Sequence, residues 1–209
     1  MRANFRTESM TMRAIAVPGV RADHERQRII GFAAKAFFQQ SYEATTVDDI
    51  AKEMGVTKGH VYYYFSSKPE ILYTVCSQAI DELLKVMRTE ISRRGRPEAK
   101  LTRVLAAHIE FIAEHPLLSR AMWTIRYGGF PTKYRRYLQQ QGSQIRQIYV
   151  DLLAQIAGAH GKPRRADLPQ MVHMIMGSVM WLPFWYLPER KGSPKTIART
   201  LAQMAVFGS

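Results

Sequence analysis

The sequence has little cysteine, few acidic residues and no long hydrophobic run. Its single cysteine, Cys76, excludes an intrachain disulfide framework and a zinc site made of several cysteines, and it favours a reducing cytoplasm. No apolar run of signal-peptide length occurs in residues 1–22, which are rich in arginine. The uncharged stretch 171–187 is short for a membrane span and contains Pro183, so we interpret it as a buried helix and expect no membrane partner.

The shortage of acidic residues leaves a strongly basic chain. There are 17 Asp and Glu against 30 Lys and Arg, for a formal charge of +13. Residues 29–75 are nearly balanced, whereas residues 131–209 hold only three acids, Asp151, Asp167 and Glu189. Such an excess predicts an anionic partner: nucleic acid, an anionic membrane surface or an acidic metabolite.

Apolar spacing predicts an all-α protein. Hydrophobic residues make up 46% of the 209 residues, which is enough to build a globular core. Helical periodicity recurs along the chain without convincing strand alternation. We expect nine helices, at about 23–40, 46–55, 57–65, 67–92, 98–114, 117–127, 133–159, 167–187 and 194–207.

The helices fall into two groups after a flexible basic arm at 1–22. Residues 23–68 form a small N-terminal unit, and residues 69–209 form a larger one. The boundary lies within the long fourth helix, near its start, so the two units are expected to be mechanically joined.

Residues Thr46–Phe65 have the spacing of a helix-turn-helix. Two short helices meet at Gly55, and glycine suits the tight turn because it tolerates positive φ. On a helical wheel of the second helix, Val61 and Phe65 share one side, and Gly59 and Tyr63 point the opposite way. The second helix therefore has a core side and an outward side.

The outward side fits DNA. Gly59 allows close approach of the backbone, His60 and Tyr63 can reach base edges, and Tyr62 can donate to a phosphate. Helix N-termini and basic side chains favour phosphates. The predicted DNA-binding residues are Thr46, Thr57, Lys58, Gly59, His60, Tyr62, Tyr63 and Lys68. The alternative is a purely structural role, because tyrosines at helical spacing also occur in protein cores.

A resemblance makes the assignment specific. The runs TTVDDIA at 45–51, GVTKGHVYYYF at 55–65 and SKPEIL at 67–72 are similar to the TetR family of transcriptional regulators. The resemblance implies a nine-helix homodimer with an N-terminal DNA-binding domain, a linking fourth helix and a C-terminal effector domain. It implies the same DNA-binding positions, although His60 departs from the commoner Thr or Ser.

We expect the last two helices to form the dimer contact. The resemblance places a four-helix bundle with the mate there, and a helix-turn-helix protein needs a two-fold partner to reach two half-sites. The same apolar residues could instead form an intramolecular core. The predicted dimerisation residues are Ile175, Val179, Ile197, Leu201, Met204 and Ala205.

An organic effector is expected among the intervening helices. Bulky apolar residues suit an apolar pocket, and arginines suit phosphates and carboxylates. The segment 181–194 also resembles TetR-type regulators that sense acyl-CoA thioesters. The predicted effector-binding residues are Phe111, Arg120, Trp123, Arg126, Tyr127, Tyr149, Met174, Trp181 and Trp185.

Other functions remain as alternatives. A multidrug-type regulator would share the fold but bind lipophilic compounds, and a nucleoid protein would bind any DNA with a steep salt dependence. We find no arrangement of residues typical of an enzyme, a metal site or a cofactor. The prediction is a ligand-responsive, DNA-binding repressor that works as a homodimer.

Overall fold

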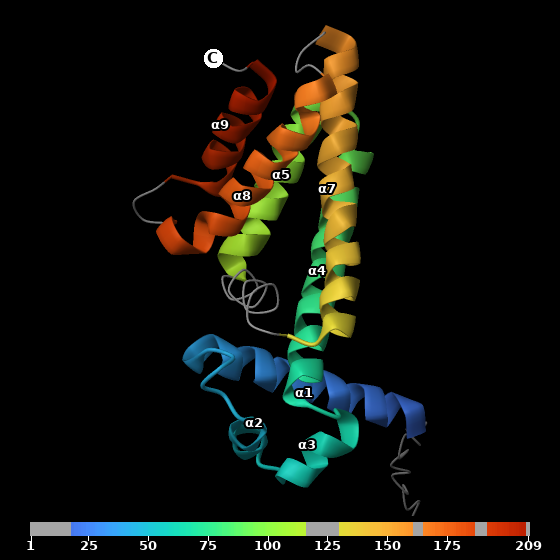
Figure 1. Cartoon of the computed structure of the whole chain (residues 1–209), viewed down its shortest axis with the longest axis vertical. Coiled ribbons are helices and arrows are strands. Elements are labelled where there is room, and N and C mark those ends of the chain that lie inside the picture. The colour runs from blue at the N-terminus through green and yellow to red at the C-terminus, as the bar shows by residue number, and fades with distance from the viewer. Residues whose placement is uncertain (1–17, 116–129, 161–164, 187–191, 208–209) are drawn as a thin grey trace, which may run out of the picture.

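The computed structural model describes residues 18–115, 130–160, 165–186 and 192–207, and their regular structure is helical (Figure 1). These residues form eight α-helices and one 3₁₀ turn. The elements are α1 Pro18–Gln40, α2 Val47–Met54, α3 Lys58–Tyr64, α4 Lys68–Ser92, α5 Pro97–Glu114, α7 Thr132–His160, η1 Arg165–Asp167, α8 Leu168–Trp185 and α9 Pro194–Phe207.

The helix expected at about 117–127 lies outside the described residues and stays a prediction, so eight of the nine expected helices are described. One helix boundary differs from the expectation. The first helix begins at Pro18 instead of residue 23, so residues 18–22 belong to α1 and not to the arm. Proline suits this position because its fixed φ matches a helix and its missing N–H would have no intrahelical partner.

Local capping explains where the helix-turn-helix begins and turns. At the start of α2, the Thr46 side chain accepts from the Asp49 backbone N–H and the Asp49 carboxylate accepts from the Thr46 N–H, a capping box. Gly55 ends α2 with a left-handed φ of 71°. Thr57 then caps α3 by accepting from the His60 backbone N–H at 3.2 Å.

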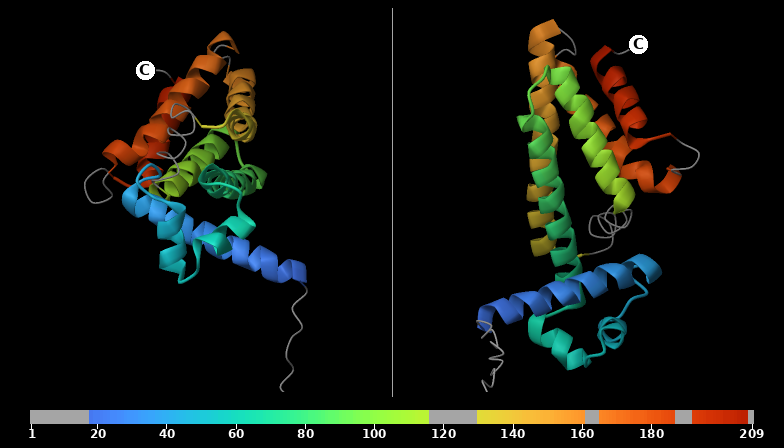
Figure 2. Two further views of the ribbon diagram at one scale, coloured as in Figure 1. Left: turned by 60° about the horizontal axis from the view of Figure 1, so that its bottom comes forward. Right: turned by 180° about the vertical axis from the view of Figure 1, so that it is seen from behind.

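The helices form two units joined by α4. Helices α1, α2 and α3 pack together at one end, and α4 leads from them into a bundle with α5, α7, α8 and α9 (Figures 1 and 2). One continuous cluster of buried apolar residues extends through both units, and it includes Ile29 of α1, Phe65 at the end of α3 and Leu83 of α4. The two units therefore share a packed apolar core in addition to their connection through α4.

The uncharged stretch that begins at 171 lies mostly in α8. No helix of the described residues combines the length and apolarity that a membrane crossing requires. One side of α8 is buried in the bundle, and this side includes Ile175 and Val179. These two predicted dimerisation residues are therefore part of the protomer's core, and the side of α8 that faces solvent is a different one.

Two glycines of the helix-turn-helix should respond oppositely to alanine. Gly55→Ala should lower the free energy of unfolding by about 1 kcal/mol, because an L side chain is strained at positive φ. Gly59 lies inside α3, where an added Cβ would meet only the Thr57 Oγ1 at 3.8 Å. Gly59→Ala should therefore raise the unfolding free energy by roughly 0.5–1 kcal/mol. Urea denaturation measures both; equal effects would contradict the assigned turn.

Candidate nucleic-acid interface

Helix α3 has the two sides that its sequence predicts. Val61 and Phe65 are buried in the apolar core, whereas Tyr63 is 82% exposed. Tyr62 is also exposed, and the Lys58 ammonium lies 6.0 Å from its ring centre. The outward side thus presents two phenol hydroxyls and one cation, groups that bind bases and phosphates.

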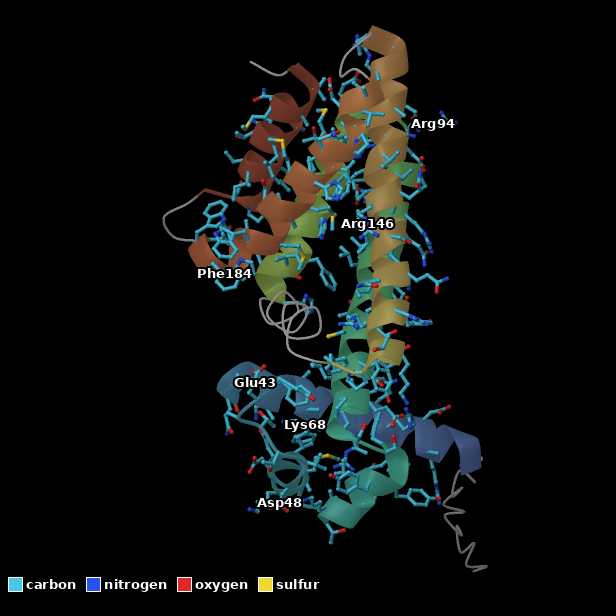
Figure 3. The ribbon with its side chains drawn as sticks, in the orientation of Figure 1. Glu43, Asp48, Lys68, Arg94, Arg146 and Phe184 are labelled. Atoms are coloured by element: carbon cyan, nitrogen blue, oxygen red, sulfur yellow. The ribbon has the colours of Figure 1, made fainter. Side chains whose placement is uncertain are left out.

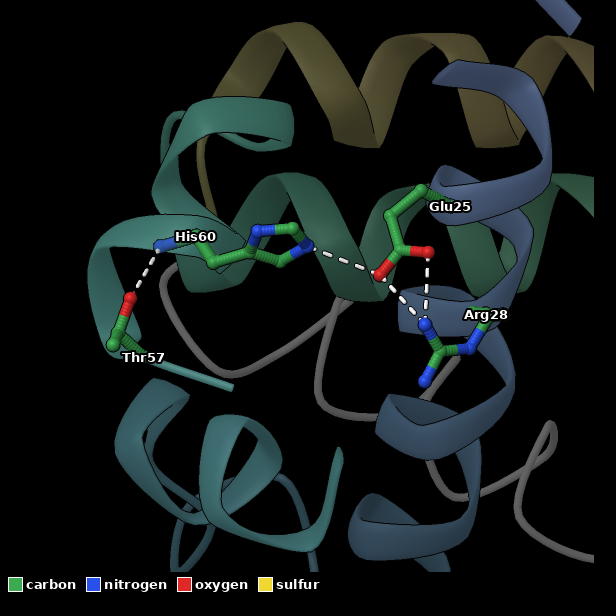
Figure 4. Close-up of polar contacts among 4 residues, drawn as sticks. All are labelled: Glu25, Arg28, Thr57 and His60. Carbon is green, nitrogen blue, oxygen red and sulfur yellow. Dashed lines mark hydrogen bonds and ion pairs between the residues drawn. The ribbon is translucent and has the colours of Figure 1, made fainter. Parts of the chain in front are cut away.

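His60 faces the protein more than its predicted role requires. Its Nε2 lies 3.0 Å from Glu25 Oε1 on α1, and Glu25 also accepts from Arg28 (Figure 4). Its ring is 5.3 Å from the Tyr64 ring. These contacts direct the imidazole toward α1. A contact between His60 and a base stays a prediction.

Lys68 is already engaged within the protein. Its ammonium donates to the carbonyls of Tyr42 at 2.9 Å and Thr45 at 2.8 Å, and it lies 4.3 Å from the Tyr42 ring centre. Lys68 therefore ties the segment between α1 and α2 to the start of α4 (Figure 3). A lysine has three donors, so one is left for the predicted phosphate contact.

The two predicted threonine contacts differ in their electrostatic surroundings. Thr46 precedes a first turn that contains two acids, Asp48 and Asp49, whereas Thr57 precedes a first turn with Lys58 and no acid. A phosphate is therefore repelled more strongly near Thr46 than near Thr57. Both threonine contacts with DNA stay predictions.

The predicted effector residues do not form one described site. Arg120, Trp123, Arg126 and Tyr127 lie outside the described residues. Phe111 and Tyr149 are buried between helices of the bundle, whereas Met174, Trp181 and Trp185 are exposed along α8. The three exposed residues of α8 therefore do not lie in the same environment as the two buried residues.

A buried polar pair joins α5 and α7. His108 Nδ1 lies 2.8 Å from the Tyr149 hydroxyl, and both residues are almost fully buried. Burial lowers the pKa of His108 to about 4 and raises the pKa of Tyr149, so both groups are neutral at physiological pH. Sequence reasoning missed this pair because residues 41 positions apart show no common pattern.

Arg146 is a second residue that sequence reasoning missed. It is partly buried on α7, three residues before Tyr149, so the two share a side of the helix. Its guanidinium has no hydrogen bond or ion pair with the part of the chain that is described, and Figure 3 labels it on the side of α7 toward α5. An arginine in such a position is a candidate anion ligand.

An apolar groove of about 470 Å³ lies between α8, α9 and Ile109 of α5. Trp181 and Trp185 of α8 line it together with Ile197 and Leu201 of α9. Trp181 is 53% exposed and stacks on Phe184 with 4.5 Å between ring centres. Met204 is exposed on α9, and Ala205 is partly buried. Four of the six predicted dimerisation residues are thus at least partly accessible.

Replacing Tyr63 tests the outward side of α3. Tyr63→Ala should weaken binding to the specific DNA site by about 1–3 kcal/mol, the size of a base contact. The free energy of unfolding should stay within about 0.5 kcal/mol, because the side chain is exposed. Fluorescence anisotropy and urea denaturation give the two values. Tyr137→Ala, at an exposed tyrosine of α7, is the matched control. Unchanged DNA affinity in Tyr63→Ala would remove this residue from the interface.

Similar sequences are transcriptional regulators. YuxN of Bacillus subtilis, an uncharacterized HTH-type transcriptional regulator, is 29% identical over 151 residues, which cover 70% of this chain and 50% of YuxN. The HTH-type transcriptional repressor KstR2 of Mycobacterium tuberculosis is 28% identical over 174 residues, 82% of this chain and 84% of KstR2. The match thus spans half of the first relative and most of the second.

Solved structures share the fold. FadR of Bacillus subtilis in complex with stearoyl-CoA has a TM-score of 0.73 at 20% identity, covering 88% of this chain and 98% of FadR. AibR in complex with isovaleryl coenzyme A and operator DNA has a TM-score of 0.73 at 18% identity, covering 87% of this chain and 97% of AibR. At these identities the likeness shows the fold alone.

Two family models account for both units of the chain. The model of the bacterial regulatory proteins, tetR family, matches residues 29–74, which contain the helix-turn-helix. The model of the tetracyclin repressor-like C-terminal domain matches residues 94–208, more than half of the chain. The chain therefore belongs to the TetR family, and it is a DNA-binding transcriptional regulator.

Proposed function

We propose that the protein is a homodimeric repressor that leaves its operator when an acyl-CoA thioester binds the C-terminal unit. The observation that carries the choice of ligand is Arg146, a partly buried cation without a protein partner among the described residues. An effector with an anionic end would supply that partner. The DNA contacts proposed for this repressor are those predicted for Thr46, Thr57, Lys58, Gly59, Tyr62, Tyr63 and Lys68.

The chemistry of the C-terminal unit supports a thioester over a lipophilic cation. Its fully buried polar side chains among the described residues include His108 and Gln141, which are neutral hydrogen-bonding groups. Residues 131–209 hold eleven basic and three acidic side chains, a balance that attracts a polyanion such as coenzyme A. FadR and AibR, which share the fold, are each described in complex with an acyl-CoA. A multidrug-type effector remains the alternative.

A chain of aromatic contacts offers a route from the effector to the DNA-binding unit. Phe130 lies 6.1 Å from Tyr42, which follows α1, and 5.9 Å from Tyr134 on α7. Tyr134 in turn stacks on Tyr73 of α4 at 4.8 Å between ring centres. Phe130 directly follows the segment with the predicted effector residues Trp123 and Tyr127. A shift of Phe130 on effector binding would therefore change the contacts of Tyr42, beside α1.

The exposed apolar side of α8 and α9 supports the dimer. Met174 and Trp181 lie two turns apart on α8, and Trp181 lines the groove with Leu201 of α9. Apolar surface of this kind marks an interaction site. A second copy is the proposed occupant because a helix-turn-helix needs a two-fold mate to bind two half-sites about one DNA turn apart. The dimer contact thus shifts from Ile175 and Val179 to Met174 and Trp181.

A charge in the groove should separate the protomers. Trp181→Glu is expected to give a monomer in sedimentation equilibrium at micromolar concentration, because a carboxylate would be buried without a partner. Operator affinity should fall at least tenfold as the paired contact is lost, a rough expectation from avidity. Val86→Glu, at an exposed apolar position of α4, is the control. A dimeric Trp181→Glu variant would place the interface elsewhere.

Effector release is tested on the DNA upstream of the protein's own gene. Acyl-CoA thioesters of several chain lengths are titrated into the protein–DNA complex, and fluorescence anisotropy follows release. Release by a thioester, but not by free CoA or the free acid, is the expected result. Tight DNA binding that no thioester disturbs, but that lipophilic cations do, would support the multidrug-type alternative.

Arg146→Gln should raise the thioester concentration needed for release by about tenfold, the size of a charge-assisted hydrogen bond. Operator affinity without effector should stay within about twofold, because Arg146 lies in the C-terminal unit. The matched control is Arg88→Gln, since Arg88 donates to Gln144 on the exposed side of α4 and α7. Equal effects of the two variants would show that Arg146 acts only through general charge.

A further inference from the structure

Two consecutive residues of α1 contact opposite parts of the recognition helix α3. Glu25 lies 3.0 Å from the His60 imidazole near the start of α3. Arg26 donates to the backbone carbonyl of Tyr64, the last residue of α3, and its guanidinium lies 4.2 Å from the centre of the Phe65 ring. Both ends of α3 are therefore held by one turn of α1.

The Glu25 carboxylate joins two cationic or protonatable groups. Its oxygens accept from Arg28 at 2.9 Å, and one of them also lies against His60 (Figure 4). The hydrogen bond with His60 first, and then that with Arg28, lowers the pKa of Glu25. The Glu25 carboxylate is therefore ionised throughout the neutral range, and it can accept a hydrogen bond from the His60 imidazole.

We propose that His60 is a positioning residue, which orients the recognition helix through Glu25 instead of reading a base. Its imidazole nitrogen is directed at α1, while the exposed Tyr63 lies on the outward side of the helix. Operator affinity then depends on the Glu25–His60 pair. The inference concerns DNA binding alone and does not depend on which effector binds.

A double-mutant cycle measured on operator DNA tests the positioning role. His60→Ala and Glu25→Ala should each weaken operator binding by roughly 3- to 10-fold, the size of one hydrogen bond. The double variant should lose no more than either single variant. Additive losses, or an effect of His60→Ala without an effect of Glu25→Ala, would overturn the proposal.

Operators with single base-pair changes separate positioning from reading. His60→Ala should weaken binding to all of them by the same factor, because a misplaced helix affects every contact. A base-reading His60 would instead lose discrimination at one base pair, and that result would refute the proposal.

Conservative variants keep the test valid if an alanine variant fails to fold. Glu25→Gln and His60→Gln retain hydrogen-bonding groups, so each should bind operator within about threefold of the unmodified protein at pH 8. Glu53→Gln is the control, because Glu53 pairs with Lys35 between α1 and α2 and leaves α3 alone. A loss of operator affinity greater than threefold in both conservative variants, with Glu53→Gln unchanged, would contradict the role of the hydrogen-bonded pair.

Discussion

The position of α3 depends on contacts with its neighbours, because a helix of seven residues is too short to be stable by itself. Val61 and Phe65 anchor its inner side in the core, and Thr57 fixes its start. The polar contacts from Glu25 and Arg26 then set its orientation against α1. The outward tyrosines are displayed at a defined angle only as long as these contacts hold.

Because α1 holds α3 in position, contacts between α1 and the C-terminal unit also bear on the position of α3. Its C-terminal part packs near Tyr42, whose ring contacts both Phe37 of α1 and Phe130 at the start of the second described segment. Lys68 adds hydrogen bonds from the first turn of α4 to the carbonyl of Tyr42. A change in the C-terminal unit can therefore reach α3 by way of α1 and α4, without unfolding either unit. Under the proposed function, such a change is what the effector stabilises.

The sequence predicted the elements that depend on local rules. Periodicity placed the helices, Gly55 and Thr57 marked the turn and the cap, and the wheel of α3 separated Val61 from Tyr63. It could not predict contacts made between distant residues, such as Glu25 with His60 or His108 with Tyr149. It also misassigned the sides of α8, since both sides are apolar and periodicity alone does not tell which one packs inward. Ile175 therefore appeared available to a mate, and Trp181 appeared to belong to an internal pocket.

Release from DNA by the proposed effector requires that the two recognition helices of the homodimer stand at one separation on DNA and at another with effector. Native Cys76 is buried, and burial raises its thiol pKa to about 12, so it resists labelling. A cysteine introduced at the exposed Lys52 of α2 can then carry a spin label in each protomer. Pulsed electron paramagnetic resonance should show one narrow distance with operator and a shifted distribution with the releasing thioester. The same distribution in both states would contradict the account.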